Sequence, residues 1–330
     1  MRVFVTREIA DFAIRMMEEA GHEVVLWTEK RGLTPAELIS YCKDYDALLS
    51  VGSNKINEQF LEASRHLKVI ALHSVGFDNV DVAAATRLKI PVGNTPGVLS
   101  GATADIAFLL LLATSRKAFY HHKRIAKGDW HFFEPMADVG IELTGRTLGI
   151  YGLGKIGFEM AKRCKGAYDM KIIYHNRSNN PEAEEKLGAE KVTFDELLSR
   201  SDVLSVHTAL TPETTGRFNK EAFGKMKKSS IFINTARGSI HNEQDLLEAL
   251  QQQLIWGAGL DVTNPEPMAP GNPLLDMPNV SVLPHIGSGT QETRNEMIRL
   301  AAENIISGLK GEKIPYPVNP EVYDKDTHSR

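Results

Sequence analysis

The chain has 330 residues, 42% of them hydrophobic and 24% charged, which is enough for about two globular domains and excludes a small disulfide-stapled fold. A formal net charge of -4 offers no general attraction to nucleic acid or to an anionic membrane surface, so we expect neither partner. The longest apolar run, 106–113, is much shorter than the roughly 18 residues that span a bilayer, and no export signal is visible.

The first part of the chain, up to about residue 95, is predicted to be a small α/β unit. A helix is expected after Thr34, because Thr34, Pro35 and Glu37 supply an N-cap, a first-turn proline and a capping-box glutamate. Strands are expected near 2–5, 23–27, 47–51 and 69–72. Polar, glycine-bearing turns follow the last two of these strands, where a parallel sheet binds its ligands.

A turn-rich boundary at 94–100 precedes a long helix predicted from about 101 to 119. Its centre is apolar on every side and should be buried in a domain or subunit interface. The segment 121–141 follows without clear periodicity and carries Trp130, Phe132 and Phe133. Such aromatics can cap a core, but beside an apolar helix they favour a subunit interface.

The stretch 148–157 combines a short apolar run with a Gly-x-Gly-x-x-Gly sequence and the start of a helical pattern. Gly152 would allow the tight turn, Gly154 the approach of a pyrophosphate, and Gly157 the close packing of helix on strand. The glycine pattern alone is weak evidence for a dinucleotide. It is strengthened by further strand-like runs that alternate with helices, at 171–175, 202–207, 230–234, 257–262 and 280–283. This alternation predicts a doubly wound parallel sheet.

Three strand ends of this second sheet carry reactive side chains, namely Arg237, Glu266 and His285. In a parallel sheet their loops share one edge with the glycine turn. An imidazole oriented by a carboxylate can exchange a proton near neutral pH, and a guanidinium can hold a substrate carboxylate. Each residue alone could be structural, but together beside the glycine turn they indicate a dehydrogenase.

The last predicted helix, 290–309, is expected to pack back on the first unit, and the tail from residue 310 to lie over the surface or fray. Cys42 and Cys164 lie in separate predicted helices, so we expect no disulfide and a cytoplasmic protein. No histidine or cysteine cluster has metal-ligand spacing, and no metal is assigned.

Nearly the whole chain resembles the D-isomer-specific 2-hydroxyacid dehydrogenase family, and within it the glyoxylate/hydroxypyruvate reductases. The segments that carry the resemblance are 74–81, 94–99, 103–105, 152–157, 236–238, 259–262, 266–267 and 284–288. The resemblance implies a Rossmann cofactor domain, residues 100–286, inserted in a flavodoxin-like substrate domain, residues 1–99 and 287–330. It also implies a homodimer, with a dimerisation helix and arm at about 101–141.

By the same resemblance, Arg237 binds the carboxylate and carbonyl of a 2-oxo acid, His285 is the general acid or base, and Glu266 is its partner. Substrate contacts are implied for Ser74, Val75, Gly76 and Ser288, and Phe133 is the aromatic that would reach a neighbouring site. Cofactor contacts are implied for Thr103, Gly152, Leu153, Gly154, Lys155, Ile156, Gly157, Asn176, Arg177, Ser178, Thr235, Ala236, Asp261, His285 and Gly287.

Cofactor choice is predicted from the residues that follow strand 171–175. NAD-specific proteins usually carry an acidic residue there, which repels a 2′-phosphate. This chain has Asn176, Arg177 and Ser178 instead, and Asp169 precedes the strand. The sequence therefore favours NADP(H), with NAD(H) as the alternative.

The sequence is also compatible with other functions. Corepressors of the same family use the fold as a dinucleotide-sensing binding module and keep similar site residues. An oxidoreductase acting on 2-ketogluconate, 3-phosphoglycerate or phosphite would also suit the triad. Formate dehydrogenases are disfavoured, because they pair the histidine with glutamine rather than with a residue such as Glu266.

Overall fold

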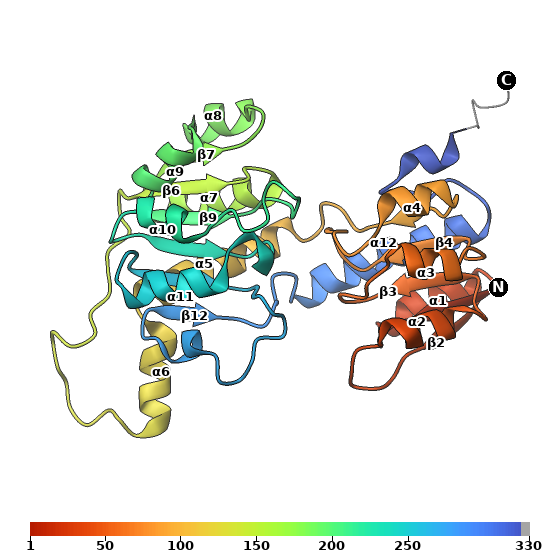
Figure 1. Cartoon of the computed structure of the whole chain (residues 1–330), viewed down its shortest axis with the longest axis horizontal. Coiled ribbons are helices and arrows are strands. Elements are labelled where there is room, and N and C mark those ends of the chain that lie inside the picture. Colours follow the sequence, from red (N-terminus) through yellow and green to blue (C-terminus); the bar gives the residue numbers. More distant parts are fainter. Residues whose placement is uncertain (325–330) are drawn as a thin grey trace. The chain divides into compact units, whose positions relative to one another are not determined.

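The computed structural model describes residues 1–324. The chain divides into two compact units, Met1–Leu99 with Thr290–Arg330 and Ser100–Gly289 (Figure 1). The second boundary was expected between residues 286 and 287. It lies three residues later because Ile286 and Gly287 donate backbone hydrogen bonds to Asp261 of the second unit.

The first unit is built on a five-stranded, fully parallel sheet in the order β2-β1-β3-β4-β5. This order is the flavodoxin-like one and confirms the predicted class. The strands are β1 (Arg2–Val5), β2 (Glu23–Leu26), β3 (Ala47–Ser50), β4 (Val69–Leu72) and β5 (Val92–Gly93), with helices α1 (Asp11–Glu19), α2 (Pro35–Cys42), α3 (Glu58–Ala63) and α4 (Val82–Arg87). The two-residue β5 was not predicted, because so short a strand has no pattern to detect.

Helix α12 (Gln291–Leu309) packs on this sheet through Ile298, Ala301 and Ile305, as the sequence predicted. The tail beyond it was expected either to lie over the surface or to fray, and residues 310–324 lie on the surface of the unit. The buried Asn319 side chain accepts a hydrogen bond from Val92 N and donates one to Ile90 O, and a short 3-10 helix, η3 (Pro320–Tyr323), follows. Side-chain amides therefore hold the tail on the unit.

The second unit contains a seven-stranded parallel sheet in the order β12-β11-β10-β9-β6-β7-β8. The order reverses between β6 and β9, as in a Rossmann sheet, with one strand added at the β12 edge. The strands are β6 (Thr147–Tyr151), β7 (Lys171–His175), β8 (Glu190–Lys191), β9 (Val203–Val206), β10 (Ile231–Asn234), β11 (Gly257–Leu260) and β12 (Val280–Val282). The helices are α5 (Ser100–Ser115), α6 (Ala118–Lys127), α7 (Lys155–Tyr168), α8 (Pro181–Leu187), α9 (Phe194–Arg200), α10 (Lys220–Lys225) and α11 (Glu243–Gln251), with 3-10 turns η1 (Gly238–Ile240) and η2 (Pro273–Asp276).

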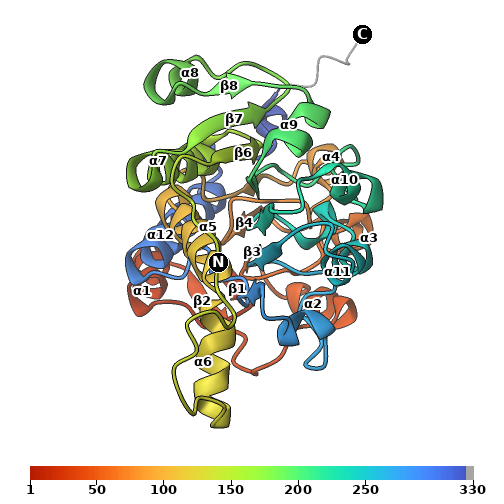
Figure 2. The same ribbon diagram turned by 90° about the vertical axis from the view of Figure 1, so that its left-hand side faces the viewer.

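The helix predicted to run to residue 119 is in fact two helices, because Lys117 adopts a left-handed conformation with φ 51° between α5 and α6. The start of the segment predicted to be irregular, 121–127, is thus helical. From the end of α6 the chain continues as a loop to about residue 142, and both views show α6 and this loop extending from the body of the second unit (Figures 1 and 2). We call residues 118–142 the arm.

Cys42 and Cys164 are free and buried, and burial raises the pKa of each thiol to about 12, so both are unreactive. Among the helices of residues 1–324, none combines the length and the apolarity needed to cross a membrane.

Candidate active site

The glycine turn between β6 and α7 has the geometry that its three glycines predict. Gly152 has φ 96°, and a Cβ on it would lie 2.6 Å from Thr208 N. A Cβ on Gly157 would lie 2.7 Å from Gly152 O, so the helix start is closely packed on the turn. A Cβ on Gly154, by contrast, would meet no atom within 4 Å. The space beside the N-terminus of the 14-residue helix α7 is therefore open on the side where backbone amides favour an anion, which fits a dinucleotide pyrophosphate.

Two asparagines after β7 hold this turn in place. Asn176 accepts a hydrogen bond from Leu153 N at 2.7 Å and donates one to Leu153 O at 3.3 Å. Asn180 donates a second bond to Leu153 O at 2.9 Å. The amide of Leu153 and the side chain of Asn176, both predicted to contact the cofactor, thus bond to each other. Asn180 was not predicted, since its sequence signal, an asparagine before Pro181, identifies only a helix cap.

The predicted acid-base pair, His285 and Glu266, lies after β11 and β12. His285 Nδ1 is 2.6 Å from Glu266 Oε1, and both side chains are partly exposed, at 45% and 37%. The hydrogen bond to Glu266 is the main cause that raises the pKa of His285, against an opposing effect of burial. Burial by itself would raise the pKa of Glu266, but the hydrogen bond from His285 and the charges of His285 and Arg237 hold it below its ordinary value. With Nδ1 bonded to Glu266, Nε2 is the nitrogen that can exchange a proton with a ligand.

Asp261, predicted to contact the cofactor, holds the loop of His285. Its two carboxylate oxygens accept the backbone N–H groups of Ile286 at 2.8 Å and Gly287 at 2.7 Å, and the residue is 1% exposed. Burial raises its pKa, although these two hydrogen bonds oppose the shift. Thr103 donates to Gly287 O at 3.2 Å. These contacts support the left-handed conformation of His285, whose φ is 55°.

The Arg237 loop follows β10 and is tied to the loop that carries Glu266. Arg237 Nη1 donates to Ala236 O at 2.7 Å, and the residue itself is half-buried. A Cβ on the next residue, Gly238, would lie 1.9 Å from Thr263 O, so the two loops are in backbone contact. Only glycine allows this approach. The structure thus brings Arg237, Glu266 and His285 to one edge of the sheet of the second unit.

The remaining predicted cofactor residues of this unit lie along the same edge. They are Lys155 and Ile156 in the first turn of α7, Arg177 and Ser178 exposed after β7, and Thr235 and Ala236 after β10. Ser288 is half-buried in the turn after His285.

In the first unit, Ser74, Val75 and Gly76 form the turn after β4. Ser74 Oγ donates to Gly76 O at 2.7 Å, and Asn94 Nδ2 donates to Val75 O at 2.7 Å. Within residues 1–324, the N–H groups of Val75 and Gly76 donate to no protein acceptor. The turn therefore presents two adjacent backbone donors.

The sequence reasoning missed two residues beside the cofactor edge. Lys191 Nζ donates to Arg177 O at 3.3 Å and to Asn179 Oδ1 at 2.9 Å, so a second cation lies at the end of β7. His207 follows β9, and its Nε2 is 2.8 Å from Ser205 Oγ. Burial lowers the pKa of His207 to about 3. Pairing of the short β8 with β7 brings Lys191 beside Arg177, and no sequence motif predicts that pairing.

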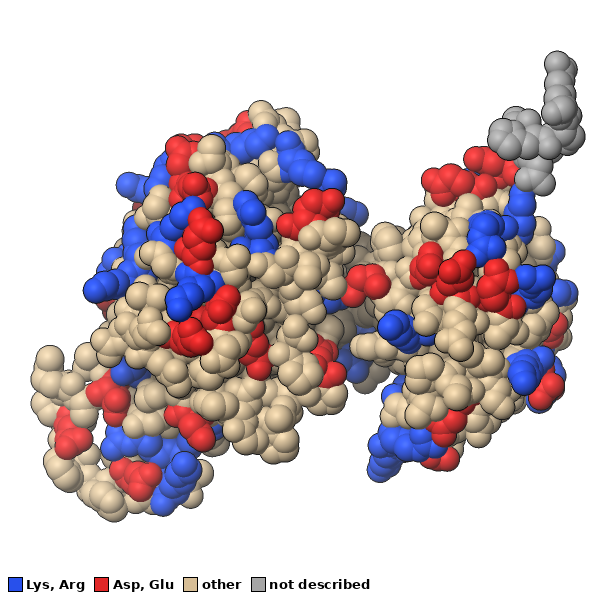
Figure 3. All heavy atoms as spheres, in the orientation of Figure 1, with Lys and Arg blue, Asp and Glu red and all other residues tan. Residues whose placement is uncertain are grey.

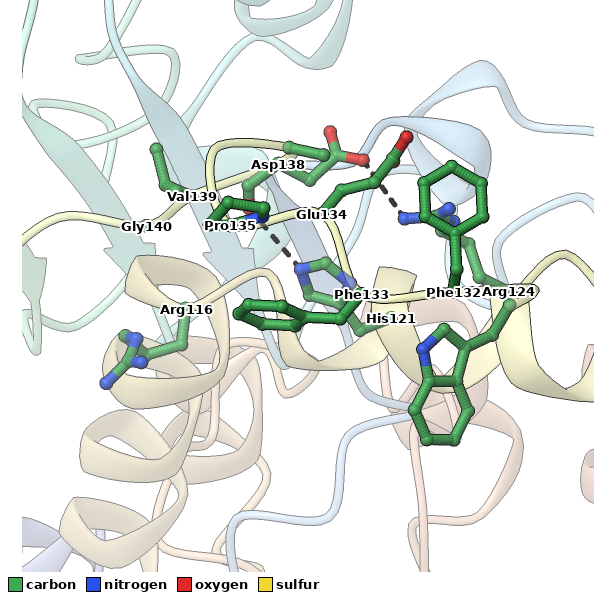
Figure 4. A pocket seen from close by; sticks show the side chains of 12 residues that line it. Arg116, His121, Arg124, Phe132, Phe133, Glu134, Pro135, Asp138, Val139 and Gly140 are labelled. Atoms are coloured by element: carbon green, nitrogen blue, oxygen red, sulfur yellow. Dashed lines mark hydrogen bonds and ion pairs between the residues drawn. The ribbon is translucent and has the colours of Figure 1, made fainter.

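The arm forms a hollow of about 330 Å³ around Asp138 (Figure 4). Asp138 Oδ2 is 3.4 Å from Arg124 Nη1, and Asp138 O is 3.3 Å from His121 Nε2. The aromatic residues around the hollow are exposed: Trp130 and Phe132 at 69% each and Phe133 at 83%. Acidic and basic side chains are interspersed on the face shown in Figure 3, also near the arm.

Among residues 1–324 no group of three or more His, Cys, Asp or Glu side chains could hold a metal ion. A Rossmann-type sheet with an open glycine turn defines a dinucleotide-binding protein, and a carboxylate-histidine pair lies on the same sheet edge.

Comparison with known proteins specifies this class. The family description "D-isomer specific 2-hydroxyacid dehydrogenase, NAD binding domain" matches residues 108–287. A glyoxylate reductase of Thermococcus litoralis is 42% identical over 325 residues, covering 97% of each chain. The structure of a glyoxylate reductase from Paecilomyes thermophila is similar with a TM-score of 0.85 and 33% identity, over 96% of this chain and 98% of that one. An NADPH-dependent glyoxylate/hydroxypyruvate reductase from Sinorhizobium meliloti, solved with NADP and malonate, has a TM-score of 0.83 and 31% identity, over 98% of both chains.

The chain therefore belongs to the D-isomer-specific 2-hydroxyacid dehydrogenase family, as its motifs predicted, and its second unit is the nicotinamide-dinucleotide-binding domain.

Proposed function

We propose that this protein reduces a small 2-oxo acid, glyoxylate or hydroxypyruvate, to the 2-hydroxy acid with NADPH. The observation that carries the proposal is the 2.6 Å contact of His285 Nδ1 with Glu266 Oε1 on the same sheet edge as Arg237 and the glycine turn. The glyoxylate reductases among its relatives point to the same substrate class.

In the proposed mechanism a bound reduced nicotinamide supplies the hydride. His285, protonated through its pairing with Glu266, donates a proton from Nε2 to the carbonyl oxygen as negative charge develops there. Glu266 accepts the Nδ1–H bond throughout and stabilises the imidazolium. In the reverse direction the neutral imidazole takes the proton from the hydroxyl group.

For substrate binding we propose that the Arg237 guanidinium holds the carboxylate and the carbonyl oxygen, because its planar fork matches a carboxylate. The adjacent N–H groups of Val75 and Gly76 are proposed as further donors to the carboxylate, with Ser74 and Ser288 nearby. The hydrogen bonds of the Val75–Gly76 turn, which leave these two donors to a ligand, support this assignment.

The preference for NADP(H) is the finer part of the proposal. A 2′-phosphate would be bound by Arg177 and Ser178, and Lys191 adds a second positive charge beside Arg177. The Arg177→Ala and Lys191→Ala variants should each weaken NADPH binding by about tenfold while NADH binding changes less than twofold. Unchanged NADPH affinity in both variants would mean that neither Arg177 nor Lys191 binds the 2′-phosphate.

We also propose that the protein is a homodimer joined through α5 and the arm. Leu109 of α5 is 44% exposed, and the aromatic side chains of the arm, including Phe133, are also exposed to solvent. The variant Phe132→Ser with Phe133→Ser should shift the mass in light scattering from dimer to monomer. A monomeric wild type would contradict the proposal.

The deciding experiment is the initial rate with glyoxylate, hydroxypyruvate, 2-ketogluconate and pyruvate, each with NADPH and NADH. Faster turnover of glyoxylate or hydroxypyruvate, with NADPH preferred, is the expected result. A folded protein that binds dinucleotide but reduces none of the four acids would instead favour the binding-module function.

A further inference from the structure

Asn234 is the last residue of β10 and begins the loop that carries Arg237. Its side chain is fully buried. Its Oδ1 accepts a hydrogen bond from Ala236 N at 3.0 Å, and its Nδ2 donates one to Arg237 O at 2.9 Å. The side-chain amide therefore bonds to the backbone on both sides of the peptide that joins Ala236 to Arg237. The position of Arg237 depends on the orientation of this amide.

A second buried side chain sets that orientation. His241 Nδ1 is 3.0 Å from Asn234 Nδ2, and His241 is 1% exposed. Because burial lowers the pKa of His241 to about 4, the ring is neutral near pH 7, and Nδ1 is the acceptor of the amide hydrogen. The Asn234 NH2 group thus has two acceptors, His241 Nδ1 and Arg237 O. In the flipped amide the Asn234 oxygen, itself an acceptor, would face both of these acceptors, so the observed orientation is favoured.

The imidazole is in turn held firmly by its neighbours. Phe218 N donates to Ile240 O at 3.1 Å and Asn242 N donates to Phe218 O at 2.9 Å, so the backbone on either side of His241 is bonded to one residue. The ring meets the Phe232 ring edge to face, with centroids 5.8 Å apart. Rotation of the ring away from Asn234 would break this packing.

Stability alone does not explain a histidine at this place. Its Nε2 is buried and has no hydrogen-bond partner among the described residues, which costs free energy that an apolar side chain would not cost. Within residues 1–324 the ring makes one polar contact, the bond to Asn234. A locally unfavourable residue with a single directed contact beside a substrate-binding loop indicates a role in the site.

We propose that His241 is a positioning residue for substrate recognition, acting through the Asn234 amide to fix the Arg237 loop. This inference rests on the proposed function, since it assigns Arg237 to the 2-oxo acid. The contact of Gly238 with Thr263 carries the effect further, because a displaced Arg237 loop would also press on the loop of Glu266.

The test compares two substitutions at His241. His241→Phe keeps the ring but removes the acceptor, and it should raise the KM for glyoxylate about tenfold while the KM for NADPH stays within about twofold. His241→Asn places an acceptor oxygen where Nδ1 lay and should restore the KM to within about threefold of wild type. His241→Leu, which also lacks the acceptor, replaces the phenylalanine variant if that variant does not fold.

A double-mutant cycle separates positioning from packing. In an Asn234→Ala background the His241→Phe substitution should have no further effect on the KM for glyoxylate, because its target is gone. The control is His22→Phe in the first unit, where neither ring nitrogen of the buried His22 has a hydrogen-bond partner among the described residues. That variant should leave both KM values unchanged.

Two results would overturn the inference: a KM for glyoxylate in His241→Phe equal to that of wild type, or an effect of His241→Phe that persists in full in Asn234→Ala. A wild-type protein that reduces no 2-oxo acid would instead refute the proposed function. In that case the affinity of the cofactor complex for oxalate, compared between wild type and His241→Phe, tests the arginine loop without turnover. A reduction of about tenfold supports the inference, and equal affinity overturns it.

Discussion

On the sheet edge of the second unit that carries the candidate site, the glycine turn and the His285–Glu266 pair are built in different ways. At the glycine turn after β6, the backbone itself forms the site, and the absence of side chains at Gly152, Gly154 and Gly157 creates it. After β11 and β12, side chains form the site, and Asp261 holds His285 through two backbone amides from 25 and 26 residues away. The glycine turn is therefore readable from local sequence, whereas the support of the acid-base pair depends on the folded sheet.

This difference predicts which properties a substitution in each region changes. A substitution at the glycine turn should affect cofactor binding, the fold, or both, depending on what the added Cβ meets. A substitution in the acid-base pair should affect turnover and its pH dependence while cofactor binding persists.

The largest effect is expected for His285→Ala. Removal of the group that exchanges the proton should lower kcat by about 10²–10⁴-fold, because that is the usual contribution of general acid-base catalysis. The dissociation constant of NADPH, measured by fluorescence, should stay within about twofold. Parallel loss of turnover and NADPH binding would mean that His285 mainly supports the fold.

The second prediction separates two glycines of the turn. Gly154→Ala should weaken NADPH binding roughly tenfold or more but leave the Tm of the cofactor-free protein nearly unchanged, because its Cβ meets no protein atom within 4 Å. Gly152→Ala should lower both the NADPH affinity and the Tm. Gly152 has φ 96°, and the added Cβ would lie 2.6 Å from Thr208 N. Equal losses of Tm in the two variants would contradict an open space beside Gly154.

The third prediction concerns Glu266→Gln. Without the carboxylate the raised pKa of His285 should fall, because the hydrogen bond that His285 donates to Glu266 is its main cause. The rate of 2-oxo acid reduction, which needs the protonated imidazole, should then decline at a lower pH than in wild type, and kcat should fall about tenfold. For the reverse oxidation, which needs the neutral imidazole, activity should appear at a lower pH. A pH profile that does not move would show that Glu266 does not tune His285.

The smallest effect concerns stability below neutral pH. Burial lowers the pKa of His207 to about 3, so between pH 6.5 and about 3 the unfolded chain binds a proton at His207 that the folded chain does not. The free energy of unfolding should therefore fall as the pH drops through this range. In His207→Gln this slope should be smaller by about 1 kcal/mol per pH unit between pH 6 and 5, as measured by urea unfolding. An unchanged slope would mean that His207 is protonated in the fold.

Much of the fold could be predicted because its signals are local. The capping box at Thr34, with Glu37 bonded to Thr34 N at 2.8 Å, starts α2 where the sequence placed it. The strand-like runs became β1 to β4 of the first sheet and the long strands of the second. The strands β5 and β8 escaped prediction, because two residues cannot show a period and only pairing with a neighbour makes them strands.

The points that the sequence missed or left open had equally specific causes. Apolar periodicity continued past Lys117, but its left-handed backbone ended α5, and α6 took a new direction. The composition of the tail left packing on the surface and fraying both open, and two buried hydrogen bonds of the Asn319 side chain hold it beside β5. Composition does not reveal such partners, which lie more than 200 residues apart in the chain.

By itself the sequence determined the two parallel sheets, the dinucleotide turn and the presence of arginine, glutamate and histidine at strand ends, because hydrophobic period, glycine and capping chemistry act over a few residues. Only the tertiary structure decided what holds those groups in place: Asp261 on the histidine loop, Asn176 on the glycine turn, and His241 with Asn234 on the arginine loop. These are hydrogen bonds of buried or half-buried side chains with the backbone or with each other. Their geometry exists only when the sheet has aligned strands that are distant in sequence.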